Sequence, residues 1–217
     1  AGCAIEYEAA GAGELAMLDS TATIDNRQTL LDVVRHGAPA ATVPFSGGGG
    51  VRNAGAAAGG IEAAANIIST SGGGLRKPEE IREMVRLLGS EKVTVAIDVD
   101  RNPKLASGYE VYIDGGRTAT GKDAIEWAKQ VDGYGVGCIL PTSKAADGAR
   151  TGYDLNIIRQ IVKAVSVPVV ASGGAGTMEH FYEAAMAGAT ILLAASVFHF
   201  GLIQIPELKK YLQSKLI

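Results

Sequence analysis

The feature that most constrains this sequence is an internal repeat with an offset of 124 residues. Val43-Pro44, followed by a run of glycines, lies 124 residues before Val167-Pro168, which is followed by Ser172-Gly173-Gly174. The same offset carries residues 67–72 onto residues 191–196. The chain therefore looks like two half-barrels of four β-α units each.

Short apolar runs alternate with longer amphipathic stretches, a pattern typical of β-α units that feed a parallel sheet. Seven strands are expected, at residues 15–19, 42–46, 67–71, 93–98, 137–141, 167–171 and 191–195. Amphipathic spacing predicts helices at residues 78–88, 123–130, 154–165, 178–187 and 206–216. Within residues 101–121, the alternation from Tyr109 to Ile113 and the turn at Gly115-Gly116 predict an inserted hairpin.

Together these features predict an α/β protein of the (β/α)8 TIM-barrel type, with parallel strands and two half-barrel repeats in a single domain, residues 1–217. The strand that ends at Asp98 would have its repeat counterpart before residue 1. We therefore expect the first strand to be absent from the chain and the barrel to be incomplete at the N-terminus. A barrel without one strand has two unpaired edges.

Composition and charge narrow the classes of partner. The 217 residues are 47% hydrophobic and carry a net charge of −3, with acids and bases interspersed, which gives no basic face for a nucleic acid. The longest apolar run, residues 190–203, is interrupted by His199 and is shorter than the roughly 20 residues that span a bilayer. His36, His180 and His199 share no ligand spacing. We expect a cytoplasmic protein with a small-molecule partner, no membrane or nucleic acid contact, no metal and no cofactor.

Residues 46–74 are unusual, because 17 of these 29 residues are Ala or Gly. A helix there would offer little to the core beyond Val51 and Ile61, so we expect it to pack weakly. Two interpretations stay open for this stretch: a naturally flexible segment, or a sequence that is engineered or incompletely known.

The repeat also points to two phosphate sites. In parallel barrels, phosphate commonly docks in the loops after the last two strands, where small residues let backbone N–H groups approach the anion. Two expected strand ends carry such residues, namely Gly173, Gly174, Ala195 and Ser196. The repeat places a second set at the equivalent strand ends, namely Gly49, Gly50, Ser71 and Gly72. The pattern favours an elongated substrate with a phosphate at each end, although tight turning alone would also explain the glycines.

Asp98 is the leading candidate for an acid or base. It ends an apolar strand, which leaves a carboxylate at the catalytic face with an aliphatic interior behind it. The alternatives are a helix cap or an ion pair with Arg101. Asp19 ends the first expected strand in the same way, and Thr142 and Asp147 follow the fifth strand, where they are candidates to hold ligand hydroxyls.

Several of these motifs resemble the cyclase subunit of imidazole glycerol phosphate synthase. The similar segments are Val95-Ala96-Ile97-Asp98, residues 171–176 and residues 194–200. The resemblance implies a lyase of histidine biosynthesis that combines a ribulosyl bis-phosphate with ammonia from a glutaminase subunit to form imidazole glycerol phosphate. It also implies two acid/base aspartates, of which Asp98 matches one.

The other aspartate of that family lies at the end of the first strand, so we expect the chain as given to be impaired, by roughly 10²- to 10⁴-fold for one lost proton transfer. Ser71-Gly72 stands where the family has Asn-Thr. The family's charged ring for ammonia entry matches Glu14, but Ile67 and Cys138 replace two of its charged members, which weakens the expected coupling to a glutaminase.

Two other functions stay open. One is a catalytically silent or engineered barrel scaffold that still binds phosphate. The other is the sister aminoaldose-ketose isomerase, which would need a second acid/base residue near Thr142 or Asp147.

Overall fold

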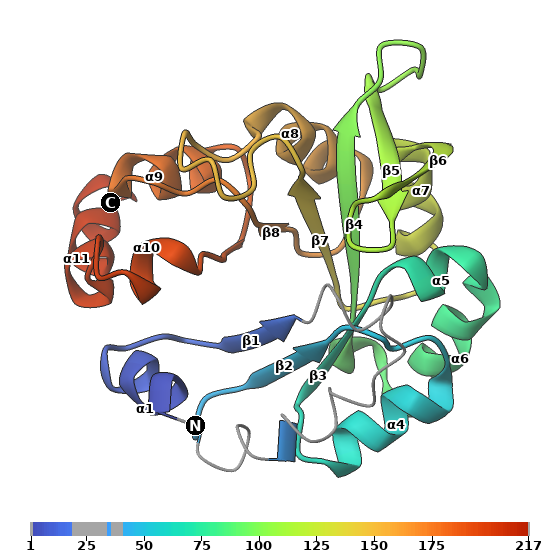
Figure 1. The fold of residues 1–217 in the computed structure, drawn as a ribbon, viewed down its shortest axis with the longest axis horizontal. Coiled ribbons are helices and arrows are strands. Elements are labelled where there is room, and N and C mark those ends of the chain that lie inside the picture. The colour runs from blue at the N-terminus through green and yellow to red at the C-terminus, as the bar shows by residue number, and fades with distance from the viewer. Residues whose placement is uncertain (1, 19–33, 36–40, 217) are drawn as a thin grey trace.

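The computed structural model of the protein describes residues 2–18, 34–35 and 41–216, and these form an α/β fold dominated by parallel strands (Figure 1). Five strands pair in parallel in the order β1 (Leu15–Leu18), β2 (Phe45–Gly48), β3 (Ile67–Thr70), β4 (Val93–Arg101) and β7 (Cys138–Ser143). β8 (Val170–Ala171) and β9 (Ile191–Leu192) form a separate parallel pair. Single bridges join β7 to the β8 segment, from Ile139 to Val169 and from Thr142 to Ser172. A parallel strand lies at each of the seven expected places, although several bounds differ.

Helices follow the strands along the outer side of the curved strand path (Figure 1). The longer ones are α4 (Ala54–Glu62), α6 (Pro78–Leu88), α7 (Ala124–Asp132), α8 (Leu155–Ala164), α9 (Met178–Met186) and α11 (Ile205–Leu216). α6 begins with Pro78 in its first turn, ends at Gly89 with φ 92°, and buries Ile81 and Met84. Its bounds are those that the apolar spacing predicts.

Several short elements were not anticipated from the sequence. They are α1 (Gly2–Ala9), α5 (Gly72–Arg76), the 3₁₀ turn η2 (Ser90–Lys92) and α10 (Ser196–His199). The prediction of a strand at residues 191–195 is corrected by β9, which ends at Leu192, and α10 begins directly after the predicted strand. Likewise β8 covers only the last two residues of the expected strand at 167–171.

β2 is shifted along the chain from the expected residues 42–46 to 45–48. Pro44 has no N–H to donate to a ladder, and its carbonyl accepts from Leu15 N at 3.0 Å just before the pairing of β1 with β2 begins. The glycines then continue the strand through a narrow space, since a Cβ at Gly48 would lie 2.7 Å from Leu18 Cδ2.

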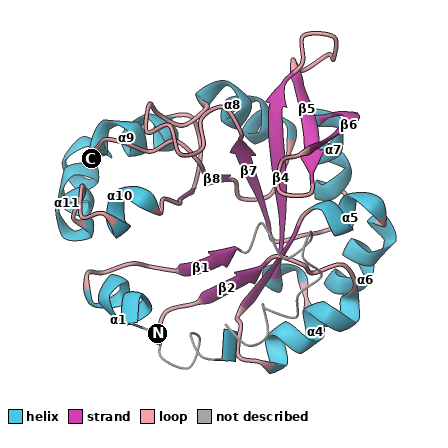
Figure 2. Ribbon diagram, in the orientation of Figure 1, coloured by secondary structure: helices cyan, strands magenta, loops and turns pink. Residues whose placement is uncertain are grey.

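The inserted hairpin is confirmed. β5 (Tyr109–Ile113) pairs antiparallel with the end of β4 and with β6 (Thr118–Asp123), and β4 and β5 extend together beyond the other strands (Figure 2). Its base is held by the Tyr109 hydroxyl, which donates to Asp154 Oδ1 at 2.7 Å. Arg76 forms an ion pair with Asp114 at 2.7 Å near the turn.

The Gly/Ala-rich stretch forms α4, which packs by close approach rather than with large side chains. Its buried positions are Ala54, Ala57 and Gly60, and a Cβ at Gly60 would lie 2.5 Å from Ile68 Cδ1. Val51 is buried as expected, whereas Ile61 is only partly buried. Ile61 packs against the core as expected, but the expectation that the helix offers little beyond Val51 and Ile61 was wrong, because Ala54 and Ala57 also belong to the core and Gly60 brings the helix backbone close to β3.

The two faces of the parallel strands carry different cores. Residues such as Ile97, Val99 and Ile139 face the helices and pack with Trp127 and Ile157. Side chains alternate along a strand, so the intervening residues lie on the opposite, inner face. There a small apolar cluster forms from Ala96, Cys138, Leu140, Val170 and Leu193. No described helix has the length and apolar character that crossing a membrane takes.

Candidate active site at the carboxyl ends of the strands

A row of polar residues lies just beyond the inner apolar cluster. Asp98 on β4 is the register partner of Thr142 on β7, and Thr142 is bridged to Ser172. Each of the three lies two residues after a member of the apolar cluster, so each shares its inner face. The carboxyl ends of three neighbouring strands thus bring together Asp98, Thr142 and Ser172.

Asp98 has the electrostatic surroundings expected of an acid or base. Burial raises the pKa of Asp98 to about 6, the charge of Asp147 adds to this shift, and the charge of Lys144 opposes it. A carboxyl group with a pKa near the working pH can both donate and accept a proton. Asp147, a residue of the loop after β7, therefore lies near enough to influence Asp98, as does Lys144.

The alternative in which Asp98 pairs with Arg101 does not fit the geometry. Arg101 Nη2 instead lies 3.6 Å from Asp154 Oδ1, and the Arg101 guanidinium lies 4.4 Å from the centre of the Tyr109 ring. Asp98 lies in the middle of β4, which extends to Arg101, so it does not cap a helix either.

Lys144 is fixed over the hairpin side of the site. Its backbone N–H donates to Val99 O at 2.9 Å, which holds the loop after β7 against the end of β4. Its ammonium lies 3.7 Å from the centre of the Tyr112 ring and 3.7 Å from Asp100 Oδ2. Lys144 thus brings a positive charge to the same side of the strands as Asp98.

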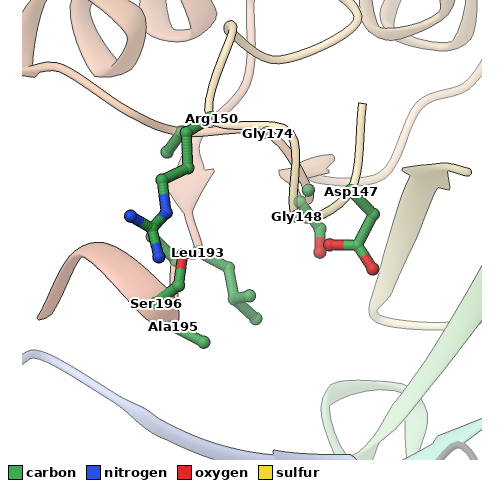
Figure 3. Close-up of a pocket in the computed structure, with 11 residues that line it drawn as sticks. Asp147, Gly148, Arg150, Gly174, Leu193, Ala195 and Ser196 are labelled. Carbon is green, nitrogen blue, oxygen red and sulfur yellow. The ribbon is translucent and has the colours of Figure 1, made fainter. Parts of the chain in front are cut away.

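A pocket of about 140 Å³ opens beside this row (Figure 3). It is smaller than the roughly 300 to 1,000 Å³ of sites for drug-sized ligands, so it suits one chemical group of a ligand. Its lining brings together five of the residues singled out from the sequence, namely Asp147, Gly173, Gly174, Ala195 and Ser196. The rest of the lining consists of Gly148, Arg150, Ser172, Ala175, Leu193 and Ala194.

The glycines of this pocket are required by the backbone. Gly173 and Gly174 have φ of 80° and 109°, in the region that favours glycine. A Cβ at Gly174 would collide with the carbonyl oxygen of Gly152, and Gly152 N donates to Gly174 O at 2.8 Å. The loop after β8 is therefore packed tightly against residues 150–152, with small residues facing the pocket.

The second predicted phosphate set is not part of this pocket. Gly49 and Gly50 form the turn after β2 with φ of 109° and 70°. Ser71 and Gly72 begin α5, where a Cβ at Gly72 would lie 3.1 Å from the Cβ of Ile113 in the hairpin. These four residues do end neighbouring strands as expected, but their role in binding stays a prediction.

At the opposite end of the strands, Glu14 and Cys138 lie near one another. Burial raises the pKa of Cys138 to about 11, and the charge of Glu14 adds to the shift. Ile67 begins the strand β3 and is partly exposed. Asp19 lies outside the described residues. Among the residues that are described, no group of three or more His, Cys, Asp or Glu side chains is arranged to hold a metal ion.

Comparison with known proteins places the chain in a family. The model for the family described as histidine biosynthesis protein matches residues 1–204. The chain belongs to this family. Three relatives are each named imidazole glycerol phosphate synthase subunit HisF. The one from Pyrobaculum aerophilum is 45% identical over 212 residues, covering 98% of this chain and 83% of the relative. The one from Thermobifida fusca is 45% identical over 212 residues, covering 96% and 83%. The one from Thermococcus onnurineus is 43% identical over 209 residues, covering 96% and 82%.

The resemblance inferred from the sequence motifs of this histidine biosynthesis protein is therefore confirmed. Two residues of its site were missed by sequence reasoning, Arg150 as a member of the pocket lining and Lys144 as a charge near Asp98. Both are basic residues in the loop after β7, the strand that pairs with β4 beside Asp98. This position was the available signal, but sequence spacing does not show where either side chain points.

Proposed function

We propose that this histidine biosynthesis protein is a cyclase-type lyase subunit that uses ammonia and a ribulosyl bis-phosphate to form imidazole glycerol phosphate. The observation that carries the proposal is the placement of Asp98, with its pKa raised to about 6, beside a pocket built from the Ser172–Gly174 loop and Ser196. The names of the three relatives support the same activity.

For the architecture, we propose a (β/α)8 TIM-type barrel of two half-barrel repeats in a single domain. β3 begins at Ile67 and β9 at Ile191, which is the spacing of the sequence repeat and supports two related halves. β1 and β9 stand at the ends of the described strand path, and both expose apolar side chains, among them Met17 at 39% and Ile191 at 37%. We propose that one further strand, the counterpart of β4, belongs between them.

In the proposed reaction, Asp98 moves the proton. At pH 7 a carboxyl group with a pKa of about 6 is mostly ionised and is able to accept a proton from the reacting atoms, while its protonated form is accessible for the return step. We propose that Gly173, Gly174, Ala195 and Ser196 bind one phosphate and that Thr142 and Asp147 bind hydroxyl groups between the phosphate and Asp98. The set Gly49, Gly50, Ser71 and Gly72 is proposed for the other phosphate. No metal or cofactor is needed for these roles.

We further propose a glutaminase subunit as the ammonia source and a cytoplasmic location. The end of the strands where Glu14 lies near Cys138 is the proposed entry for ammonia.

The sister aminoaldose-ketose isomerase is the second candidate, and one observation favours it. Asp147 lies near Asp98, which would supply the second acid/base residue that this reaction needs. An unsubstituted chain without isomerase activity would remove this candidate, and isomerase activity that is unchanged in Asp147→Asn would exclude Asp147 as its second acid/base residue.

The deciding experiment measures turnover of the bis-phosphate by the isolated chain in excess ammonium salt. Chromatography detects the imidazole glycerol phosphate that forms. We expect slow turnover that falls by roughly 10²- to 10⁴-fold in Asp98→Asn. Equal rates for both chains would contradict the role of Asp98. A folded chain that binds phosphate but gives no product above background would favour the silent scaffold instead.

A further inference from the structure

We propose that Arg150 is a specificity-determining residue of the pocket, and that its guanidinium binds the substrate phosphate held beside Ser196. The inference deepens the proposed function and rests on it. It does not follow from the sequence motifs, in which Arg150 is one basic residue in the loop between β7 and α8.

The backbone at Arg150 is held in an uncommon conformation. Its φ is 57°, a value that non-glycine residues rarely adopt. The surrounding loop fixes it there, because the carbonyl of Arg150 lies where a Cβ at Gly176 would be and Gly152 N donates to Gly174 O at 2.8 Å. Strained positions of this kind are concentrated at binding and catalytic sites, because there they hold a side chain in the orientation that binds the ligand.

That conformation directs the side chain along the pocket. Figure 3 shows the Arg150 guanidinium beside Ser196 and Leu193, whereas Asp147 lies on the other side of the pocket. The guanidinium also lies 5.3 Å from the centre of the Phe200 ring. Phe200 is 63% exposed, so its ring is available as a flat surface that steadies the cation.

The charge of Arg150 is not neutralised by a neighbouring acid. Within residues 2–18, 34–35 and 41–216, no carboxylate forms an ion pair with it. Asp147 and Arg150 are the only ionisable residues of the pocket lining, and they stand at opposite sides. An anionic group therefore gains most at the Ser196 side, and the Asp147 side suits hydroxyl groups that donate hydrogen bonds.

A guanidinium matches this ligand well. It is always charged and presents several N–H donors in a planar fork, which can bind two oxygens of one phosphate. The glycine loop can offer backbone N–H groups, but it carries no net charge. Arg150 would therefore distinguish a charged phosphate end from an uncharged hydroxyl end of similar size.

The test is calorimetric binding of glycerol 3-phosphate to the intact chain, with inorganic phosphate as a second probe. We expect Arg150→Met to weaken binding about tenfold, as for loss of one charge-assisted contact, and Arg150→Lys to restore part of that loss. Arg159→Met, which removes an exposed arginine of α8, is the matched control and should bind like the unsubstituted chain.

Arg150→Gly separates binding from folding. Glycine adopts a φ of 57° without strain, so this variant should resist denaturant at least as well as the unsubstituted chain while binding phosphate as weakly as Arg150→Met. Equal affinities for Arg150→Met and the unsubstituted chain would overturn the role of Arg150 and leave the phosphate site intact. A folded unsubstituted chain that binds neither probe would overturn the proposed phosphate site and the role of Arg150 together.

Discussion

The carboxylate of Asp147 lies close enough to Asp98 to raise the pKa of Asp98, although Asp98 belongs to β4 and Asp147 to the loop after β7. Lys144, three residues before Asp147, opposes that effect. One loop therefore carries both charges that adjust the proposed acid/base residue. Such opposing neighbours let a site set a pKa without changing the residue that reacts.

Replacing Asp98 with Asn should stabilise the fold at pH 8. The pKa of Asp98 is raised from 3.8 to about 6 in the folded chain, so its contribution to stability is fully present below about pH 4 and is lost as the pH rises through 6. Asn avoids that loss. Discounting for partial solvent contact, we expect a gain of about 2 kcal/mol in the free energy of unfolding at pH 8.

Urea denaturation of both chains at pH 8 and near pH 4 measures this gain. The second condition is an internal control, because Asp98 is then protonated in the folded chain and resembles Asn. A gain of equal size at both pH values would show that packing rather than charge explains the stabilisation.

Asp147→Asn and Lys144→Met should shift the titration of Asp98 in opposite directions. Removing the like charge of Asp147 lowers the pKa of Asp98, and removing the positive charge of Lys144 raises it. Carboxyl carbon NMR of selectively labelled Asp98 across pH 4 to 8 reports both shifts. Shifts of the same sign in the two variants would contradict the electrostatic account.

The sequence was most informative where a pattern depends on local chemistry. α6 matches its prediction because Pro78, Gly89 and the apolar spacing mark both its ends and its buried face. The proximity of Asp98, Thr142 and Ser172 could also be predicted from the sequence, because residues at the carboxyl ends of neighbouring parallel strands lie at the same edge.

What the sequence could not provide depends on tertiary contacts. β9 ends three residues before the end of the expected strand at residues 191–195, and α4 approaches β3 closely because Gly60 packs against Ile68. The direction of the Arg150 side chain depends on its positive φ, which the residue types of the loop do not predict. Charges that meet across loops, such as Lys144 and Asp98, are likewise invisible to spacing arguments.

Tyr109→Phe should loosen the base of the hairpin. The buried Tyr109 hydroxyl donates to Asp154 Oδ1 at 2.7 Å, and this bond joins β5 to the start of α8. Its loss should lower the free energy of unfolding by about 1 to 2 kcal/mol. Tyr182→Phe, which keeps the ring that lies under Lys215, is the control and should change stability by less than about 0.5 kcal/mol. Similar losses in both variants would mean that the Tyr109 hydrogen bond contributes nothing specific.

Gly174→Ala should destabilise the fold more than any other Gly→Ala substitution in the pocket lining. The new Cβ would collide with the carbonyl oxygen of Gly152, and alanine is disfavoured at the φ of 109° found there. Overpacking and backbone strain together should cost about 3 kcal/mol of unfolding free energy. Gly13→Ala is the matched control, because nothing lies within 4 Å of its Cβ position. Thermal and denaturant unfolding should show the loss of stability in Gly174→Ala and not in Gly13→Ala. If Gly174→Ala is as stable as the unsubstituted chain, the loop can move away from residues 150–152. The backbone that sets the direction of the Arg150 side chain would then not be fixed.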